Sequence, residues 1–256
     1  MYTQEEIKKF IIVDIETTSG YRTYKEFYAE KENEVKFWDK KANYLRKETE
    51  DFKELSNAEL YEKSSALYPE FGKINCISVG QIKFDENNKP SFFKKSFYGD
   101  NEQKILHKFL SFSSGLFNKV PDAKFVGHNI KRFDFPYILR RAILNGLPIP
   151  SRLKFHRIKP WENCLVDTME DWRFGGQGSV SLEHLSVMLG ILNPKEVEIY
   201  QNPFGNVASA YWEGKIEEIK DYCEGDIEAT ANIVLKVSQL NLLEKREEIN
   251  KIWAHI

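Results

Sequence analysis

The order of apolar and polar positions along the chain predicts strands that alternate with helices. Runs of β-branched and aromatic residues predict strands, and apolar residues spaced three or four apart predict helices. The expected strands are 9–15, 73–84, 90–99, 123–129 and 163–169. The expected helices are 101–117, 132–146, 181–190 and 215–240. This alternation, with an early hairpin, indicates a mixed α/β sheet flanked by helices.

Residues 28–70 differ in character from the rest of the chain. They are rich in charge and contain no glycine, and their first proline is Pro69. Trp38, Leu45 and Phe52 recur at heptad spacing, which predicts one helix through all three. Ser56 and Glu59 form a capping-box pattern, which predicts a second, shorter helix. We therefore expect a helical insertion after the first strand, within a single domain over residues 1–256.

Composition limits the class of protein. The chain has 256 residues, 41% of them hydrophobic, which is enough for a sizeable core, and its formal net charge of −2 gives no global basic field. Cys76, Cys164 and Cys223 are widely spaced and form no CxxC pair, which favours reduced thiols over a disulfide or zinc framework. No apolar run has the length of a signal-peptide core or a membrane span. We expect a soluble, cytoplasmic protein with no membrane partner.

Two carboxylates follow the first apolar strand at once. Asp14 and Glu16 lie two residues apart, so their side chains project from the same face of an extended backbone. Like charges this close are tolerated when a cation or a shared proton offsets their repulsion, and ligands gather at the carboxyl ends of strands in α/β sheets. The alternative is an exposed strand end with two solvated acids.

Two further segments carry acids in suggestive places. Asp134 lies between Phe133 and Phe135 at the start of a predicted helix, where an aspartate often serves only as a cap or a dipole partner. Tyr222 and Asp226 are four residues apart and share one face of the last predicted helix. A simple hydrogen bond between the tyrosine and the carboxylate would also explain that pair.

Taken together, "VDIET", "NIKRFD" and "YCEGD" occur in the order of a known set of motifs. They resemble the motifs of the DEDD superfamily of 3′–5′ exonucleases, which is named for four acidic residues. The resemblance assigns the four acids to Asp14, Glu16, Asp134 and Asp226. Tyr222 matches the tyrosine (DEDDy) subclass, because the histidine of the other subclass would stand where this chain has Asp221.

The nearer likeness is to the proofreading exonuclease domain of family-B DNA polymerases. The segments "YPEFGKINCISVG", "FVGHNIKRFDFPYI" and "SLEHLSVMLG" are similar to that group. The resemblance implies a ribonuclease-H-like fold, with a mixed five-stranded sheet flanked by helices. The 256 residues leave no room for a polymerase domain, so we expect a stand-alone nuclease. The charged segment 28–70 lacks a counterpart in the minimal fold.

The same resemblance implies two divalent metal ions, Mg²⁺ or Mn²⁺, which suit hard carboxylate ligands. In the family mechanism Asp14 bridges both ions, and Glu16 and Asp226 complete the site of the ion that activates water. Asp134 holds the second ion, largely through water. Tyr222 orients the attacking water, because a phenol with a reference pKa of about 10 is a poor base at neutral pH.

The substrate is expected to be a polyanion. Residues 131–160 contain eight Lys or Arg and one acid, interleaved with aromatic residues, which suits a groove that follows a nucleic-acid strand. The alternative is a solvated helix face with aromatic residues in the core. The residues expected to contact substrate are Thr17, His128, Asn129, Arg132, Phe133 and His156. For His128 a structural role in a turn is the other interpretation, and Asp167 is expected to support the site from behind.

The sequence therefore predicts a metal-dependent 3′–5′ exonuclease. It would hydrolyse phosphodiester bonds from the free 3′ end of nucleic acid, single-stranded DNA first, and release nucleoside 5′-monophosphates. RNA is the alternative substrate, because ribonuclease D-type exoribonucleases share the tyrosine subclass. A catalytically silent nucleic-acid-binding module on the same fold is a second alternative, although no metal ligand is lost. Segment 28–70 is also a candidate docking element for a protein partner.

Overall fold

A mixed five-stranded sheet organises the part of the chain that the structure describes. The computed structural model describes residues 1–154, 163–191 and 207–243. The strands are β1 Phe10–Ser19, β2 Gly72–Phe84, β3 Pro90–Tyr98, β4 Lys124–Gly127 and β5 Leu165–Asp167. They lie in the order β3-β2-β1-β4-β5. β2 is antiparallel to β1 and β3, whereas β4 is parallel to β1 and β5. This is the ribonuclease-H-like arrangement expected from the sequence.

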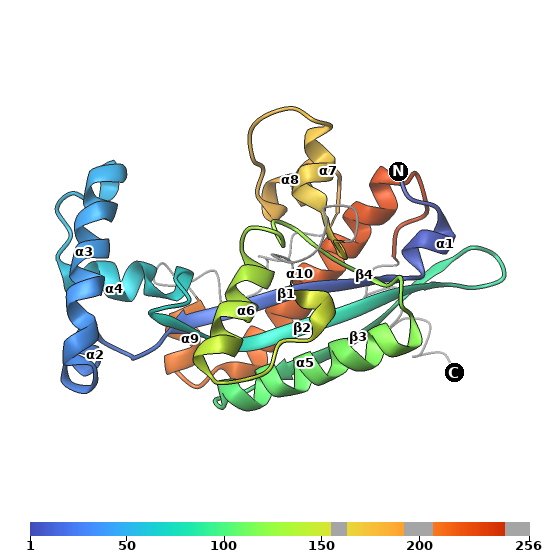
Figure 1. Cartoon of the computed structure of the whole chain (residues 1–256). Helices are drawn as coiled ribbons and strands as arrows, with labels where there is room; N and C mark the ends of the chain where they lie inside the picture. The colour runs from blue at the N-terminus through green and yellow to red at the C-terminus, as the bar shows by residue number, and fades with distance from the viewer. Residues whose placement is uncertain (155–162, 192–206, 244–256) are drawn as a thin grey trace, which may run out of the picture.

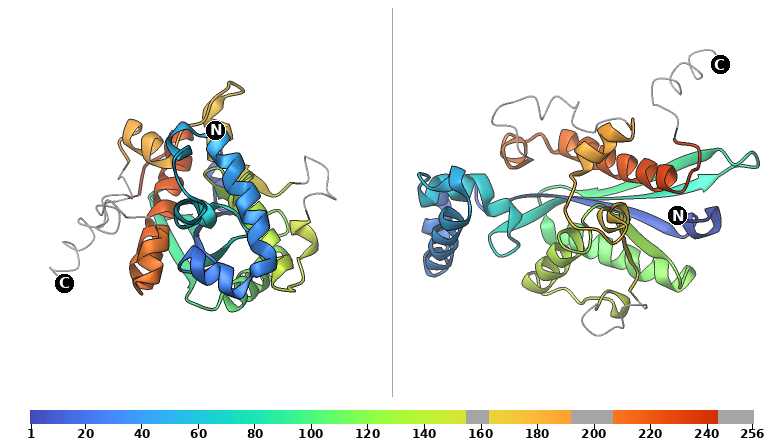
Figure 2. Two further views of the ribbon diagram at one scale, coloured as in Figure 1. Left: turned by 90° about the vertical axis from the view of Figure 1, so that its left-hand side faces the viewer. Right: turned by 90° about the horizontal axis from the view of Figure 1, so that it is seen from above.

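Helices cover both faces of the sheet. The α-helices described are α1 Gln4–Ile7, α2 Tyr24–Glu30, α3 Glu32–Glu48, α4 Asn57–Ser64, α5 Glu102–Lys119, α6 Asp134–Leu144, α7 Thr168–Arg173, α8 Leu182–Met188, α9 Val207–Trp212 and α10 Ile216–Val237. Short 3-10 helices occur at η1 Glu50–Phe52, η2 Ser65–Leu67 and η3 Ser151–Leu153. Helices α5 and α6 lie on one face of the sheet and α10 on the other (Figures 1 and 2). Among these described helices, none is long and apolar enough to cross a membrane.

The pleat of β1 decides which face carries the predicted acids. Ile11, Val13 and Ile15 are buried in the core on the side of α5 and α6. Phe10 and Ile12 are buried in a second core with residues of α10. Because side chains alternate along a strand, the positions that follow Phe10 and Ile12 on the α10 side are 14 and 16. The two acids therefore continue an apolar row of the strand.

The first strand is longer than its sequence predicts. The expected strand ended at residue 15, but β1 continues to Ser19 because β2 pairs with it as far as Ser19 opposite Gly72. The pairing register shifts between Glu16 and Thr17. On the other side, β4 pairs with β1 only over residues 10–12. The acids thus lie within β1, beyond the point where its parallel neighbour stops, and not at a strand end.

The segment between β1 and β2, residues 20–71, is called the insertion. It forms a separate lobe beside the sheet (Figure 1). Its helices pack around aromatic rings: Phe27 stacks on Tyr61 with centroids 5.0 Å apart, and Trp38 meets Tyr61 edge-on at 5.2 Å. These side chains are almost fully buried. The lobe therefore has a hydrophobic cluster of its own.

Two sequence expectations for the insertion have different outcomes. The capping box at Ser56 and Glu59 is confirmed at the start of α4. The single helix through Trp38, Leu45 and Phe52 is wrong at its end, because α3 stops at Glu48 and Phe52 belongs to η1. Phe52 still packs against the same cluster. The heptad spacing of Trp38, Leu45 and Phe52 therefore reflects their packing in one shared core and not one continuous helix.

A buried ion pair joins the end of the insertion to α5, α6 and β2. Arg141 donates through Nε and Nη2 to the carboxylate of Glu102 at 2.8 and 2.6 Å, and through Nη1 to the carbonyl of Pro69 at 2.8 Å. Glu102 also accepts the backbone N–H of Ile74 at 2.8 Å. Arg141 was one of the cations assigned to a substrate groove. Its charge is instead neutralised within the fold.

Arg141→Ala should destabilise the protein by about 3 kcal/mol, because it leaves the Glu102 carboxylate buried without its cation. Arg140→Ala is the matched control, since Arg140 is exposed and its loss should change the free energy of unfolding by less than about 0.5 kcal/mol. Urea denaturation of the two variants measures both values. Equal stability of the two variants would contradict this account.

Candidate active site

The predicted acids and the tyrosine meet at one cavity of about 590 Å³. It is lined by Asp14, Ile15, Glu16, Thr17, Glu62, Lys63, Ala66, Leu67, His128, Asn129, Phe133, Asp134, Val207, Ala208, Tyr222 and Asp226. Nine of the candidate site residues from the sequence are in this set. Arg132 is exposed and does not line the cavity, and His156 lies outside the described residues.

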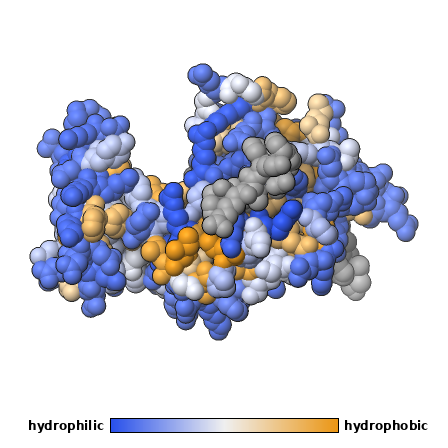
Figure 3. All heavy atoms as spheres, viewed as in Figure 1, coloured by the Kyte–Doolittle hydropathy of each residue, from blue (hydrophilic) through white to orange (hydrophobic). Residues whose placement is uncertain are grey.

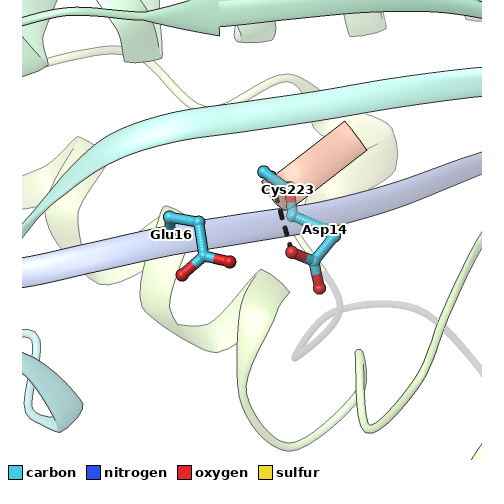
Figure 4. Close-up of side chains that lie close together, drawn as sticks. All are labelled: Asp14, Glu16 and Cys223. Carbon is cyan, nitrogen blue, oxygen red and sulfur yellow. Dashed lines mark hydrogen bonds between the residues drawn. The ribbon is translucent and has the colours of Figure 1, made fainter. Parts of the chain in front are cut away.

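The acidic side of the cavity is built from β1, α6 and α10. Asp14 and Glu16 project to the same side of β1 (Figure 4). Asp134 is the first residue of α6, and Asp226 lies one helical turn beyond Tyr222 on α10. The side chains of α10 reach β1 because Ile227, Ala231 and Val234 pack this helix against the apolar start of the strand. Packing on one face of β1 therefore brings the separate motifs together.

Asp134 does not act as a helix cap. The N-cap position of α6 is Phe133, and no side chain caps the helix there. The carboxylate of Asp134 instead accepts hydrogen bonds from its own backbone N–H and from that of Ile15 on β1. Only 3% of Asp134 is exposed. Asp134 therefore does not occupy the capping position, although as an acid in the first turn of α6 it can still interact with the helix dipole.

Cys223 is a neighbour of the acids that sequence reasoning missed. Its thiol Sγ lies 3.4 Å from Oδ2 of Asp14 and 3.5 Å from the Asp14 backbone carbonyl, and its proton can be donated to either oxygen (Figure 4). One ligand atom each from Asp14, Glu16 and Cys223 lie within 4.8 Å of one another. The signal available in the sequence was the apolar stripe of α10, which includes Cys223 and places this thiol toward the sheet.

Burial and mutual repulsion shape the ionisation of the acids. The pKa of Asp14 is raised well above its ordinary value, first by burial and then by the charges of Asp226, Asp134 and Glu16; the Cys223 thiol opposes the rise. Burial raises the pKa of Asp134 to about 7, against the lowering effect of its two backbone hydrogen bonds. Without a cation, these two carboxyls therefore keep their protons to higher pH than an ordinary aspartate does.

The loop after β4 is fixed by a carboxylate behind the cavity. Asp167, at the end of β5, accepts backbone N–H groups of Asn129 at 2.9 Å and Lys131 at 3.1 Å. Asn129 adopts φ of 66°, a left-handed conformation that asparagine tolerates better than most residues. Asp167 does not line the cavity. Its supporting role agrees with the expectation from the sequence.

His128 lines the cavity, but both of its ring nitrogens have partners within the protein. Nε2 lies 2.8 Å from the carbonyl of Val180, and Nδ1 lies 3.0 Å from the hydroxyl of Thr168. Burial is the main cause that lowers the pKa of this imidazole, so the ring is neutral near pH 7. This arrangement favours the structural interpretation of His128, in which the ring links the loop after β4 to residues 168 and 180.

The insertion contributes one wall of the cavity. Glu62 and Lys63 belong to α4, and Ala66 and Leu67 belong to η2. The carbonyl of Ala66 accepts hydrogen bonds from the hydroxyls of Thr17 and Tyr137, each at 2.9 Å. Figure 3 shows a hollow between the lobe of the insertion and the rest of the molecule. The insertion is therefore part of the site and does not face away from it.

The basic stretch 131–160 is only partly available to a substrate. Lys131 is paired with Glu170 at 2.6 Å, and Arg152 donates to the carbonyl of Pro121 at 2.9 Å. Phe135 and Tyr137 are buried in the core. Residues 155–162, which include Phe155, Arg157 and Lys159 of this stretch, lie outside the described residues. Within the described part, the interpretation as a structural segment fits better, and Phe133 alone among its aromatic residues lines the cavity.

The donor set suits hard divalent cations. Asp14, Glu16, Asp134 and Asp226 offer carboxylate oxygens to one cavity, and Glu16, Asp134 and Asp226 are each at most 8% exposed. Buried carboxylates that raise one another's pKa gain stability from a cation among them. Oxygen ligands of this kind are those that Mg²⁺ and Mn²⁺ prefer. The residues present therefore fit a divalent metal centre.

Comparison with known proteins identifies the family. Residues 68–254 match the family described as predicted 3′–5′ exonucleases related to the exonuclease domain of PolB, and the chain belongs to that family. The matched region contains Asp134, Tyr222 and Asp226 but begins after Asp14 and Glu16. The structure joins the two acids to the matched part, because β1 is the central strand of the sheet.

Among solved structures, the chain is similar to the family B DNA polymerase of the hyperthermophilic archaeon Pyrobaculum calidifontis. The TM-score is 0.49 at 16% sequence identity, and the match covers 90% of this chain and 24% of the polymerase chain. The present chain thus spans about a quarter of that protein. No curated protein matches the sequence.

In metal-free buffer, the stability contributed by Asp134 should fall as pH rises from about 4 to about 7. The folded protein keeps a proton on this carboxyl up to about pH 7, whereas the unfolded chain releases it near pH 4, so ionisation in that window favours unfolding. Asp134→Asn lacks this group and should gain stability relative to wild type between pH 5 and pH 8.

Urea denaturation of both proteins at pH 5 and pH 8 with a chelator tests this expectation. Adding Mn²⁺ to the wild type should raise its midpoint more at pH 8 than at pH 5, because metal and protons compete for the same oxygens. A stability difference between the two proteins that does not change with pH would contradict the assignment.

Proposed function

We propose that the protein is a metal-dependent 3′–5′ exonuclease that removes nucleotides from the 3′ end of single-stranded DNA and releases nucleoside 5′-monophosphates. The observation that supports it is the convergence of four carboxylates and one tyrosine, from three separate segments, on one cavity. The family to which the chain belongs consists of predicted 3′–5′ exonucleases, which supports the same reaction. A cytoplasmic location is part of the same proposal.

The proposal gives each side chain a task. Asp14, Glu16 and Asp226 would hold one divalent ion, Mg²⁺ or Mn²⁺, while Asp14 and Asp134 would hold a second. When bound, such ions supply an activated water and neutralise the leaving oxygen of a phosphodiester. Tyr222 would orient the attacking water through its hydroxyl. Its position one turn before Asp226 places both groups on the same face of α10.

Other residues of the cavity would hold the 3′ end. Phe133 offers a ring at the cavity wall on which a base can stack, and Asn129 offers an amide at the loop that Asp167 fixes. Thr17 already donates to the carbonyl of Ala66, so we assign it to shaping the cavity as well as to contacting substrate. Lys63 adds a cation at the wall formed by the insertion.

Single-stranded DNA and RNA, each labelled at the 5′ end, test the reaction and its substrate in one assay. With Mg²⁺ or Mn²⁺ we expect a ladder that shortens from the 3′ end, faster on DNA than on RNA. Chelator should abolish it, and Asp14→Ala should remain folded but inactive. Faster degradation of RNA would establish the ribonuclease D-type alternative. If the wild type binds metal but leaves both substrates intact, the exonuclease proposal is wrong and the catalytically silent nucleic-acid-binding module remains.

Tyr222→Phe should lower kcat by about 100-fold or more while metal binding is retained, because the hydroxyl positions water and is not a ligand. Tyr98→Phe is the matched control: it also removes one phenolic hydroxyl, which donates to Glu217 at 2.9 Å outside the cavity, and should leave kcat unchanged. Calorimetric titration with Mn²⁺ measures binding for both variants. Loss of metal binding in Tyr222→Phe would refute the role assigned to the hydroxyl.

A further inference from the structure

One face of α3 combines exposed aromatic rings with lysines. Phe37 and Tyr44 are 55% and 54% exposed, although they belong to residue types that are usually buried. Seven residues apart on one helix, they lie on the same face about 10 Å from each other along its axis. The surface is called the α3 surface and consists of Lys36, Phe37, Lys40, Lys41, Tyr44 and Lys47.

The lysines of the α3 surface have few acidic neighbours along the same face. Lys36, Lys40 and Lys47 follow one ridge of α3 and are exposed. Lys36 lies 5.2 Å from the centre of the Phe37 ring, and Lys41 lies 5.4 Å from that of Tyr44. Glu34 and Glu48 flank the surface at its two ends. The centre of this face therefore presents positive charge beside open aromatic rings.

The α3 surface is linked through Lys41 to the segment that forms one wall of the active-site cavity. Lys41 also lies 4.0 Å from the centre of the Tyr68 ring. Tyr68 follows Leu67, which lines the cavity and is 56% exposed. Lys41 thus lies against both Tyr44 and Tyr68, and Tyr68 is the chain neighbour of a residue that lines the cavity. On the side seen in Figure 3, the lobe of the insertion is mainly hydrophilic.

We propose that the α3 surface binds the single-stranded nucleic acid that extends from the 3′ end held in the cavity. Lysines attract the phosphates of a strand, and exposed rings stack with successive bases irrespective of sequence. A protein partner fits less well, because lysine is depleted in the centres of protein interfaces. The matched family region begins at residue 68, so the α3 surface lies before it. The direction of the strand rests on the proposed exonuclease function, whereas strand binding itself does not.

The test compares a long oligonucleotide of about 20 nucleotides with a short one, a dinucleotide, which is chosen to occupy the cavity alone. Phe37→Ala/Tyr44→Ala should raise KM for the long DNA by about tenfold, with kcat and the kinetics on the short DNA unchanged. Lys40→Ala/Lys47→Ala should weaken binding of the long DNA and make its salt dependence shallower by roughly 1.4 in log–log slope, which corresponds to two phosphate contacts.

Two control variants match the chemistry of these changes outside the α3 surface. Phe93→Ala/Tyr98→Ala removes one exposed ring of each type from β3, and Lys104→Ala/Lys108→Ala removes two exposed cations from α5. Both should behave as wild type on long and short DNA. Fluorescence anisotropy with labelled DNA and chelator measures binding without cleavage.

The outcomes separate this inference from the proposed function. If the α3 variants bind and degrade long DNA as the wild type does, the α3 surface is not a strand-binding site, even though the exonuclease remains. If the wild type degrades nothing, but both α3 variants bind long DNA more weakly than the wild type does, the α3 surface binds a strand in a protein that is not a nuclease. If the same residues bind RNA but not DNA, the α3 surface is a strand-binding site and the strand that it binds is RNA.

Discussion

Repulsion among four carboxylates that line one cavity is the constraint on which the site depends. Burial raises the pKa of Asp14 and that of Asp134, and the charge of Asp226 raises both further. A fold can hold such groups together only if packing elsewhere fixes the elements that carry them. That packing comes from two hydrophobic cores on opposite faces of β1. One core holds α10 against the strand, and the other holds α5 and α6 against it. The apolar half of β1 therefore stabilises the geometry of its acidic half.

The two edges of β1 are paired over different lengths, and this difference leaves space for the site beside the strand. Antiparallel pairing with β2 continues to Ser19, whereas parallel pairing with β4 is confined to residues 10–12. Beyond that point the loop after β4 and the start of α6 turn toward the acids. The loop keeps its shape through Asp167, and Asp134 is hydrogen-bonded to the backbone of β1 itself. The positions of the acidic side chains are thus fixed by contacts with one strand and not by contacts with one another.

The sequence predicted the strands, most helices and the acidic residues because each has a local signature. Periodicity marks the elements, and the motifs place Asp14, Asp134 and Asp226 without knowledge of the fold. It underestimated β1 because Thr18 and Ser19 look like the start of a polar loop, yet both are buried in the strand. It overestimated the basic groove because pattern alone did not reveal that Glu102 and Glu170 neutralise Arg141 and Lys131. Contributions of the insertion to the cavity depend on tertiary contacts and have no local signal.

The double hydrogen bond to the carbonyl of Ala66 has a consequence for how this lobe can change over evolutionary time. Thr17 and Tyr137 grip a main-chain oxygen, which every amino acid at position 66 would provide. The anchor is therefore indifferent to the identity of that side chain. Surface residues of the lobe can therefore change while the lobe stays aligned with β1 and its acids.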